Sequence, residues 1–143
     1  MLRHAETDAD LLICFPLMQD LRPHLADPAT FIARVRRQQQ AGYRLLAAWD
    51  GERPVGLAGY RPQENLIRGP FCYVDDLVVA PAGRRQGVGA RLLDAVAAEA
   101  RAAGLPHLVL DTGLDNGLGQ RFYFRYGMLP AALRFAMPLK EAT

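Results

Sequence analysis

The sequence has little cysteine and histidine, the residues that build disulfide frameworks and metal centres. Its 143 residues include two cysteines, Cys14 and Cys72, and three histidines. The two cysteines lie far apart in the chain and have no second Cys or His at a metal-ligand spacing. Isolated thiols of this kind are typical of proteins from a reducing compartment. We therefore expect free cysteines, no metal site and a cytoplasmic location.

Long hydrophobic runs and blocks of like charge are also missing. The longest apolar run near the start, residues 11–18, is interrupted by Pro16 and follows acidic residues. This excludes a transmembrane helix and disfavours a secretory signal. Lysine and arginine number 17 against 15 aspartates and glutamates, a formal net charge of +2. So mild a charge indicates neither disorder nor a nucleic-acid-binding surface, and we expect no nucleic-acid or membrane partner.

Half of the residues are apolar, and the pattern they follow is that of a mixed α/β chain. A length of 143 residues suits one ordinary domain, and no linker, repeat or low-complexity tract divides it, so we predict a single domain over 1–143. Two helices, the first capped by Asp10, should precede a hairpin turning at Asp50-Gly51. The predicted elements are helices over 10–19 and 28–40, strands over 43–49, 55–60 and 71–79, a polar loop over 61–69, a helix over 88–103, a strand over 107–112, a helix over 116–126 and a strand over 133–139. This order predicts a mixed sheet with antiparallel hairpins first, a strand-helix-strand crossover later, and helices on both faces.

The loop before the third helix is rich in glycine and arginine, reading Arg84-Arg85-Gln86-Gly87-Val88-Gly89-Ala90. A helix start has unpaired N–H groups and a partial positive charge, and glycine lets an anion approach closely. A nucleotide-triphosphate loop would need Gly-Lys-Ser/Thr, which is absent. A dinucleotide fingerprint would need a third glycine where Leu92 stands. Glycines that serve only turns and packing remain an alternative.

The pattern that this loop does meet is Arg/Gln-x-x-Gly-x-Gly/Ala, at Arg84 to Gly89, with Pro81 shortly before it. Here the chain resembles the GNAT superfamily of N-acetyltransferases, in which the loop and helix start bind the pyrophosphate of acetyl-CoA. The resemblance covers most of the chain, including a first strand, two helices, a long hairpin, the strand at 73–79 and the segment 116–127. It implies the GNAT acyl-CoA N-acyltransferase fold, acetyl-CoA as cosubstrate, and direct transfer to an amine of a small molecule or peptide. Many members of the family carry glycine at the position of Arg85, although the pattern leaves this position unspecified.

The resemblance also assigns residues to the cosubstrate. Backbone N–H groups at the end of the strand should polarise the thioester carbonyl, and the helix near the C-terminus should line the cofactor. The cofactor-binding residues that it implies are Val78, Val79, Arg84, Arg85, Gln86, Gly87, Val88, Gly89, Ala90, Asn116 and Tyr123.

Two residues are implied as catalytic, Asp75 and Tyr123. Strand alternation places Asp75 and Asp76 on opposite faces, and the resemblance makes Asp75 the one that faces the acceptor and takes the amine proton. An ordinary Asp has a pKa of about 3.9 against about 10.4 for a lysine-like amine, so Asp75 would need burial or a water relay. Tyr123, with a phenol pKa of about 10, can protonate the leaving thiolate. A helix cap or arginine partner for Asp75, and a packed aromatic role for Tyr123, remain alternatives.

The acceptor is not identified by the sequence, and two rival functions stay open. One is a non-catalytic acyl-CoA sensor or docking module of the same fold, and the other is a dinucleotide-dependent oxidoreductase. The sequence also leaves room for a homodimer. His24 and Asp27, between the first two helices, are candidate specificity residues. Arg34, Arg36 and Arg37 are expected on a solvated helix face.

Overall fold

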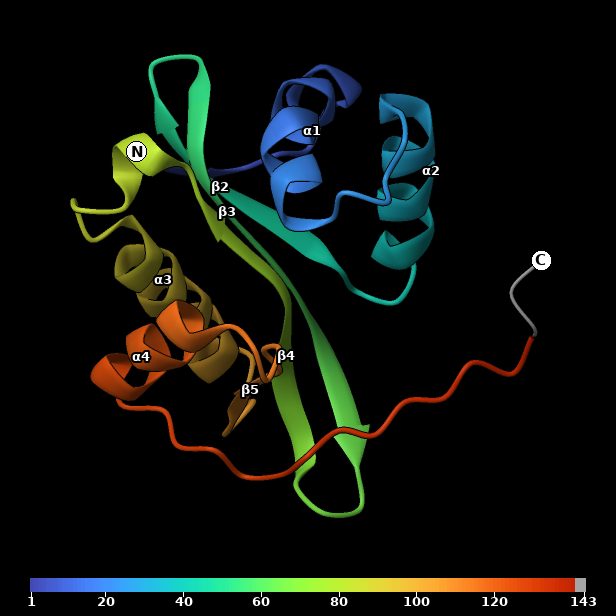
Figure 1. Cartoon of the computed structure of the whole chain (residues 1–143), viewed down its shortest axis with the longest axis vertical. Coiled ribbons are helices and arrows are strands. Elements are labelled where there is room, and N and C mark those ends of the chain that lie inside the picture. The colour runs from blue at the N-terminus through green and yellow to red at the C-terminus, as the bar shows by residue number, and fades with distance from the viewer. Residues whose placement is uncertain (141–143) are drawn as a thin grey trace. The chain divides into compact units, whose positions relative to one another are not determined.

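The computed structural model describes residues 1–140 and divides after Leu110 into two units, Met1–Leu110 and Asp111–Thr143. The described part of the first unit holds a five-stranded sheet in the order β1-β2-β3-β4-β5 (Figure 1). The first four strands pair antiparallel with their neighbours, and β4 pairs with β5 in parallel. The strands are β1 (Leu2–His4), β2 (Arg44–Asp50), β3 (Arg53–Asn65), β4 (Gly69–Val79) and β5 (Leu108–Leu110). The predicted mixed sheet, with hairpins first and a crossover after them, is confirmed.

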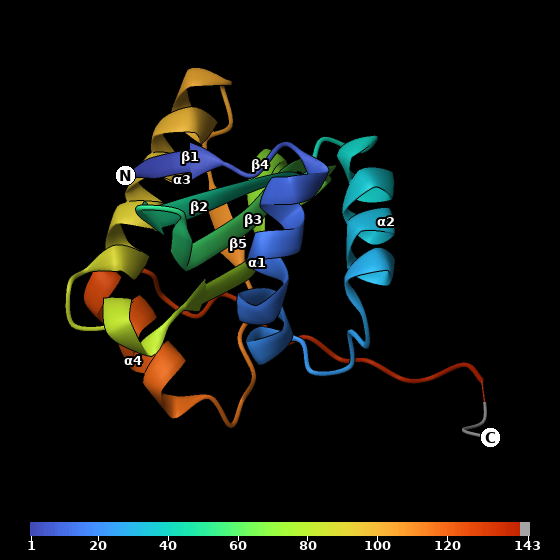
Figure 2. The same ribbon diagram turned by 90° about the horizontal axis from the view of Figure 1, so that it is seen from above.

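Helices lie on both sides of this sheet, as predicted. Helices α1 (Asp8–Leu21) and α2 (Pro28–Gln39) lie on one side, and α3 (Val88–Ala102) lies on the other (Figure 2). The α3 residues Leu92, Leu93 and Val96 are fully buried because they recur at helical spacing toward the sheet. Both cysteines are free and buried, and burial raises the pKa of Cys14 to about 12.

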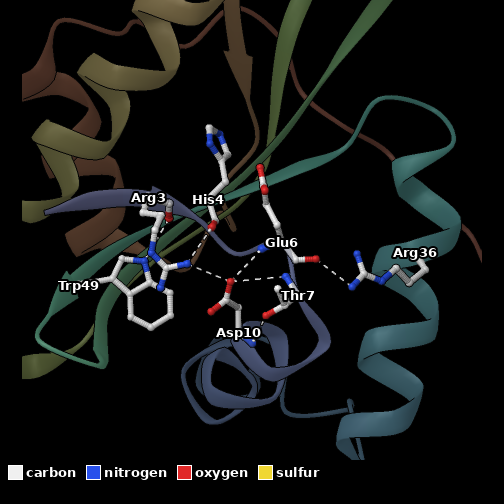
Figure 3. Close-up of polar contacts among 7 residues, drawn as sticks. All are labelled: Arg3, His4, Glu6, Thr7, Asp10, Arg36 and Trp49. Atoms are coloured by element: carbon white, nitrogen blue, oxygen red, sulfur yellow. Dashed lines mark hydrogen bonds and ion pairs between the residues drawn. The ribbon is translucent and has the colours of Figure 1, made fainter.

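The start of α1 differs from the prediction that Asp10 is its N-cap. Thr7 is the N-cap, and its hydroxyl accepts a 3.0 Å hydrogen bond from the Asp10 N–H (Figure 3). The Asp10 carboxylate in turn accepts from the Thr7 N–H, which completes a capping box. The prediction was wrong because Asp10 contributes to the cap from inside the first turn.

Two arginines tie this helix start to its surroundings. Arg3 on β1 donates a 2.9 Å hydrogen bond to Asp10, and its guanidinium lies 4.4 Å from the centroid of the Trp49 ring. Arg36 on α2 donates to the Glu6 carbonyl at 2.9 Å (Figure 3). Arg36 also donates to the carboxylate of Asp8 at 2.6 Å. These bonds hold α1 against the sheet and α2 against α1.

The hairpin of β3 and β4 is longer than predicted. Residues 61–65, expected in a polar loop, continue β3 and pair with β4 as far as Asn65 opposite Gly69. The turn is confined to 66–68, where the Asn65 side chain accepts from the Arg68 N–H. Prediction failed here because a two-stranded ribbon open to water needs no alternating apolar pattern.

The second unit contains α4 (Gly117–Tyr126), which ends at Gly127 with a φ of +107°, as predicted. The predicted strand over 133–139 is wrong, because these residues have no regular secondary structure. Their alternating apolar side chains are exposed, at 68% for Leu133 and 89% for Phe135. Alternation predicts which face of a strand is apolar but supplies no hydrogen-bonding partner for it.

None of the helices formed by residues 1–140 combines the length and the apolar character that crossing a membrane requires.

Candidate functional site

The glycine loop joins the end of β4 to the start of α3. After Val79, a short 3₁₀ turn (Pro81–Gly83) leads to Arg84, whose Nε donates to the Val79 carbonyl at 3.2 Å. Gly87 follows as the residue that caps α3, with a φ of +70°. Residues that carry a side chain rarely adopt this left-handed backbone conformation, so this position requires glycine. A Cβ at Gly87 would meet no atom within 4 Å, so the space beside it is open.

The first turn of α3 has no side chain to satisfy its N–H groups. Gly87 offers no capping oxygen, and the turn contains no acidic residue. The N–H groups of Val88, Gly89 and Ala90 therefore have no side-chain cap, and they lie at the partly positive start of the helix. The helix itself is firmly seated, because a Cβ at Gly56 on β3 would lie 2.7 Å from Val88. The arrangement suits an anion, and the binding roles predicted for Arg84 through Ala90 stay predictions.

One edge of β4 is open beside this loop. β5 pairs with β4 only from Cys72 to Val74, while β3 pairs with β4 along the opposite edge as far as Val79. Within the described residues, no strand pairs with the β5-side edge of β4 over 75–79. Main-chain groups there, including those around Val78 and Val79, are available to an extended ligand. Sequence patterns give no sign of this divergence because it depends on where β5 ends.

A β-bulge interrupts the alternation of β4 at the two aspartates. Gly59 on β3 pairs with Asp76, and the next residue, Tyr60, pairs with Val74, so that Asp75 is the extra residue. A bulge of this kind redirects the side chains around it. Strand alternation predicts that Asp75 faces the acceptor pocket and Asp76 does not. A cavity on this side of the sheet is lined by Asp76 and not by Asp75, and which of the two faces the acceptor stays a prediction.

Asp75 is held by an arginine on the neighbouring strand. Arg61 on β3 donates from Nε at 3.0 Å and from Nη2 at 2.6 Å, one bond to each carboxylate oxygen. The same contact raises the pKa of Arg61. Both oxygens of the Asp75 carboxylate are therefore occupied by Arg61 in a bidentate pair. The alternative noted from the sequence, an arginine partner for Asp75, therefore describes its contacts in the structure.

Asp76 is contacted by two residues from other parts of the chain. Its carboxylate accepts a 2.8 Å hydrogen bond from the Tyr43 hydroxyl and a 3.1 Å bond from Nε of Arg22. Burial raises the pKa of Asp76, although both bonds act in the opposite direction. Burial and the charge of Asp76 raise the pKa of Tyr43, which therefore remains a protonated donor. Gly59 makes this contact possible, because a Cβ there would overlap the Tyr43 hydroxyl.

The cavity beside Asp76 has a volume of about 260 Å³. Its walls come from α1, the segment after α1, α2 and the residue before β2. The lining residues are Met18, Arg22, His24, Leu25, Phe31, Arg34, Val35, Gln38, Tyr43 and Asp76. Of the candidate specificity residues, His24 belongs to this lining, whereas Asp27 caps α2 by accepting from the Thr30 N–H at 2.7 Å.

Sequence reasoning missed three cavity residues, Arg22, Arg34 and Tyr43. Arg34 is exposed, as expected of a solvated face, and it also lines the cavity together with Gln38, one turn further along α2. Its spacing from Phe31 was the available signal, because residues three apart share a helix face. Nothing in the local sequence pointed to Tyr43 or Arg22, which meet Asp76 only through the tertiary fold.

In the second unit, Asn116 and Tyr123 have distinct settings. Asn116 is the N-cap of α4, and its side chain accepts from the Gly119 N–H at 3.0 Å and donates to Thr112 at 3.0 Å. A Cβ at Gly119 would lie 2.8 Å from Cγ of Asn116, so the cap fills the space above this glycine. Tyr123 packs edge-on against Phe122, and burial raises the pKa of its hydroxyl. Their roles toward a cofactor stay predictions.

Comparison with known proteins agrees with this architecture. The model of the family described as Acetyltransferase (GNAT) matches residues 9–128. The uncharacterized N-acetyltransferase YhdJ of Bacillus subtilis (strain 168) is 33% identical over 110 residues, which cover 76% of this chain and 77% of the relative. The family match extends over parts of both units.

Solved structures of similar fold include two aminoglycoside acetyltransferases. An apo aminoglycoside antibiotic 6'-N-acetyltransferase from Acinetobacter haemolyticus has a TM-score of 0.83 at 17% identity, with 99% of each chain covered. The aminoglycoside N-acetyltransferase AAC(6')-Iy in complex with CoA has a TM-score of 0.85 at 19% identity, with 98% of this chain and 95% of that chain covered. At these identities the likeness concerns the fold.

Proposed function

This chain belongs to the acetyltransferase (GNAT) family, and we propose that it transfers the acetyl group of acetyl-CoA to an amine bound in the cavity beside Asp76. One observation carries the proposal. The stretch of β4 with an open edge, residues 75–79, has the Asp76 cavity at one end and the uncapped start of α3 after the other. A single strand thus connects a place for an acceptor with a place for an anion.

The cosubstrate fits the loop by its chemistry. The pyrophosphate of acetyl-CoA requires several N–H donors and positive charge, which the start of α3 supplies at Val88, Gly89 and Ala90. The side chains of Arg84, Arg85 and Gln86 are exposed around it. The extended pantetheine arm would lie along the open edge of β4, where main-chain groups near Val78 and Val79 can hold the thioester carbonyl.

The acceptor amine must lose a proton to attack. We propose that Asp76 attracts the amine and takes this proton, directly or through water, because its carboxylate lines the cavity and burial raises its pKa toward that of a useful base. Asp75, the base predicted from the sequence, remains the rival. Its bidentate pair with Arg61 weighs against it, because those two bonds already occupy both carboxylate oxygens.

The leaving group must gain a proton. When the amine nitrogen bonds to the acetyl carbon, the carbon–sulfur bond breaks and CoA departs as a thiolate. We propose Tyr123 as the donor to this thiolate, and Asn116 as a residue beside the cofactor. Burial keeps the Tyr123 hydroxyl protonated at neutral pH, which an acid requires.

We further propose that residues 1–143 act as a single catalytic domain, because the family match spans 9–128. The buried free thiols suit the cytoplasm.

The rival function is an acyl-CoA-binding module without catalysis. Calorimetry with acetyl-CoA, CoA and NAD, followed by thiol release from acetyl-CoA across a panel of amines, tests the proposal. We expect both CoA species to bind and at least one amine to accelerate thiol release. Binding of CoA without thiol release for any amine would favour the module, and binding of NAD alone would overturn both.

A further inference from the structure

The cavity beside Asp76 is lined by more positive than negative side chains. It is lined by one carboxylate, Asp76, and by two guanidinium groups, Arg22 and Arg34. Arg22 already has partners within the protein. Its Nε donates to the Asp76 carboxylate at 3.1 Å, and its Nη2 donates to the Asp75 carbonyl at 2.7 Å. Arg22 is therefore already paired within the protein, and Arg34 is left as the second cation of the cavity.

Arg34 is that second cation. Within residues 1–140, its side chain makes no hydrogen bond or ion pair, although it lines the cavity. Arg36 on the same helix contrasts with it, because that side chain bonds to Glu6 and Asp8. A free guanidinium at the wall of a small cavity is suited to a bidentate bond with a carboxylate of a ligand.

The other walls of the cavity are apolar. Met18, Leu25, Phe31 and Val35 are each no more than 7% exposed and line it together. The volume of about 260 Å³ lies below the range of about 300–1,000 Å³ that is usual for drug-sized ligands. The occupant should therefore be small and should bury an apolar group.

We propose that the acceptor is a small amine that carries its own carboxylate on an apolar body, as a hydrophobic α-amino acid does, with Arg34 binding the carboxylate and Asp76 facing the amine. The inference rests on the proposed function and names its substrate class. A polycation is a poor match, because it would bring further positive charge beside Arg34 and Arg22.

The test uses matched acceptors that differ only in the carboxylate. These are L-leucine, L-leucinamide and 3-methylbutylamine, with L-phenylalanine, L-phenylalaninamide and phenethylamine as a second set and spermidine as a polycation. The kcat/KM for thiol release from acetyl-CoA is measured for the wild type, Arg34→Gln and Arg37→Gln. Arg37 is the control because it is exposed on the same helix and lies outside the cavity lining.

We expect the wild type to prefer the carboxylate-bearing member of a set. Arg34→Gln should lower kcat/KM for that member by about tenfold or more, mainly through KM, because a charged hydrogen bond is lost. The amide and the simple amine should change little, and Arg37→Gln should behave as the wild type. Because each acceptor is compared across variants, differences in amine pKa cancel. Preference for spermidine, or an Arg34→Gln effect equal for all three members, would overturn the inference while leaving acetyl transfer intact.

Binding separates this inference from the proposed function. Calorimetric titration of L-leucine and L-phenylalanine into the CoA-saturated protein is repeated for both variants. If thiol release fails for every amine, the proposed function fails, and weaker amino-acid binding in Arg34→Gln alone still supports the inference. Absence of amino-acid binding to the wild type overturns it.

Discussion

Tyr43, just before β2, donates a 2.8 Å hydrogen bond to Oδ2 of Asp76 on β4. The contact crosses the sheet over Gly59, the β3 residue paired with Asp76. Because a bulge gives β4 an extra residue at Asp75, it is Asp76 that reaches Tyr43 and the cavity. The site thus depends on a glycine, a bulge and a buried tyrosine.

Replacing Tyr43 by phenylalanine should change the pH dependence of activity. The hydrogen bond from Tyr43 lowers the pKa of Asp76, while burial raises it above its ordinary value. A base is active when deprotonated, so kcat/KM falls as the pH drops through this raised pKa. Removing the donor should raise the pKa further and move the acidic limb of the profile to higher pH. Tyr60→Phe is the control, because the Tyr60 hydroxyl donates to Glu99 on α3 and not to Asp76. The acidic limb of the pH profile of this variant should stay at the wild-type position.

Gly59→Ala should disturb the site through packing. A Cβ at Gly59 would overlap the Tyr43 hydroxyl and lie 2.8 Å from Oδ2 of Asp76, so Tyr43 must move. We expect a loss of about 1–3 kcal/mol in the free energy of unfolding, measured by denaturant titration, together with reduced activity. Gly117→Ala is the matched change in open space, at the first residue of α4, and should be neutral or slightly stabilising. Equal stability of the two variants would contradict the observed packing.

Gly87→Val should weaken the binding of CoA. Gly87 has a φ of +70° and open space beside it, at the start of α3 where the pyrophosphate is proposed to bind. A valine would strain the backbone and occupy that space, and we expect affinity to fall by about tenfold or more in calorimetry. Gly104→Val separates strain from obstruction, because Gly104 has a φ of +77°, open space and a position just beyond the other end of α3. Similar losses of affinity in both variants would remove the loop from the binding site.

Tyr123→Phe tests the proposed acid. The change keeps the ring that packs against Phe122 and removes the hydroxyl alone. We expect CoA affinity to stay nearly constant and kcat to fall toward the lower end of the range of about 10²–10⁴-fold for general acids, because a thiolate can also leave unassisted. Turnover at the parental rate, with chemistry rate-limiting, would assign the proton to water.

Features encoded by local sequence were predicted well. The spacing of Val88, Leu92 and Val96 and the terminating Gly104 gave α3 almost to its ends. The glycine loop could likewise be located because helix starts and positive-φ glycines have local signatures. Such features depend only on residues close together in the chain.

Features that depend on pairing between distant residues were not predictable. The bulge at Asp75 follows from the register of β4 against β3, which no run of side chains specifies. The cavity needs Arg34 from α2 and Tyr43 before β2 to meet Asp76 from β4. The expected strand over 133–139 failed for a related reason, since apolar alternation alone provides no partner strand.

The central claim is that Asp76, in its cavity, is the carboxylate that activates the acceptor amine. The most direct measurement is the single-turnover rate of acetyl transfer from bound acetyl-CoA, compared between Asp76→Asn and Asp75→Asn. Both changes replace one carboxylate oxygen by an NH2 group of similar size on adjacent residues, and the free energy of unfolding of both variants is measured alongside. The account predicts a fall on the order of 10²–10⁴-fold for Asp76→Asn and less than about tenfold for Asp75→Asn. The reverse ranking would contradict it and return the role to Asp75.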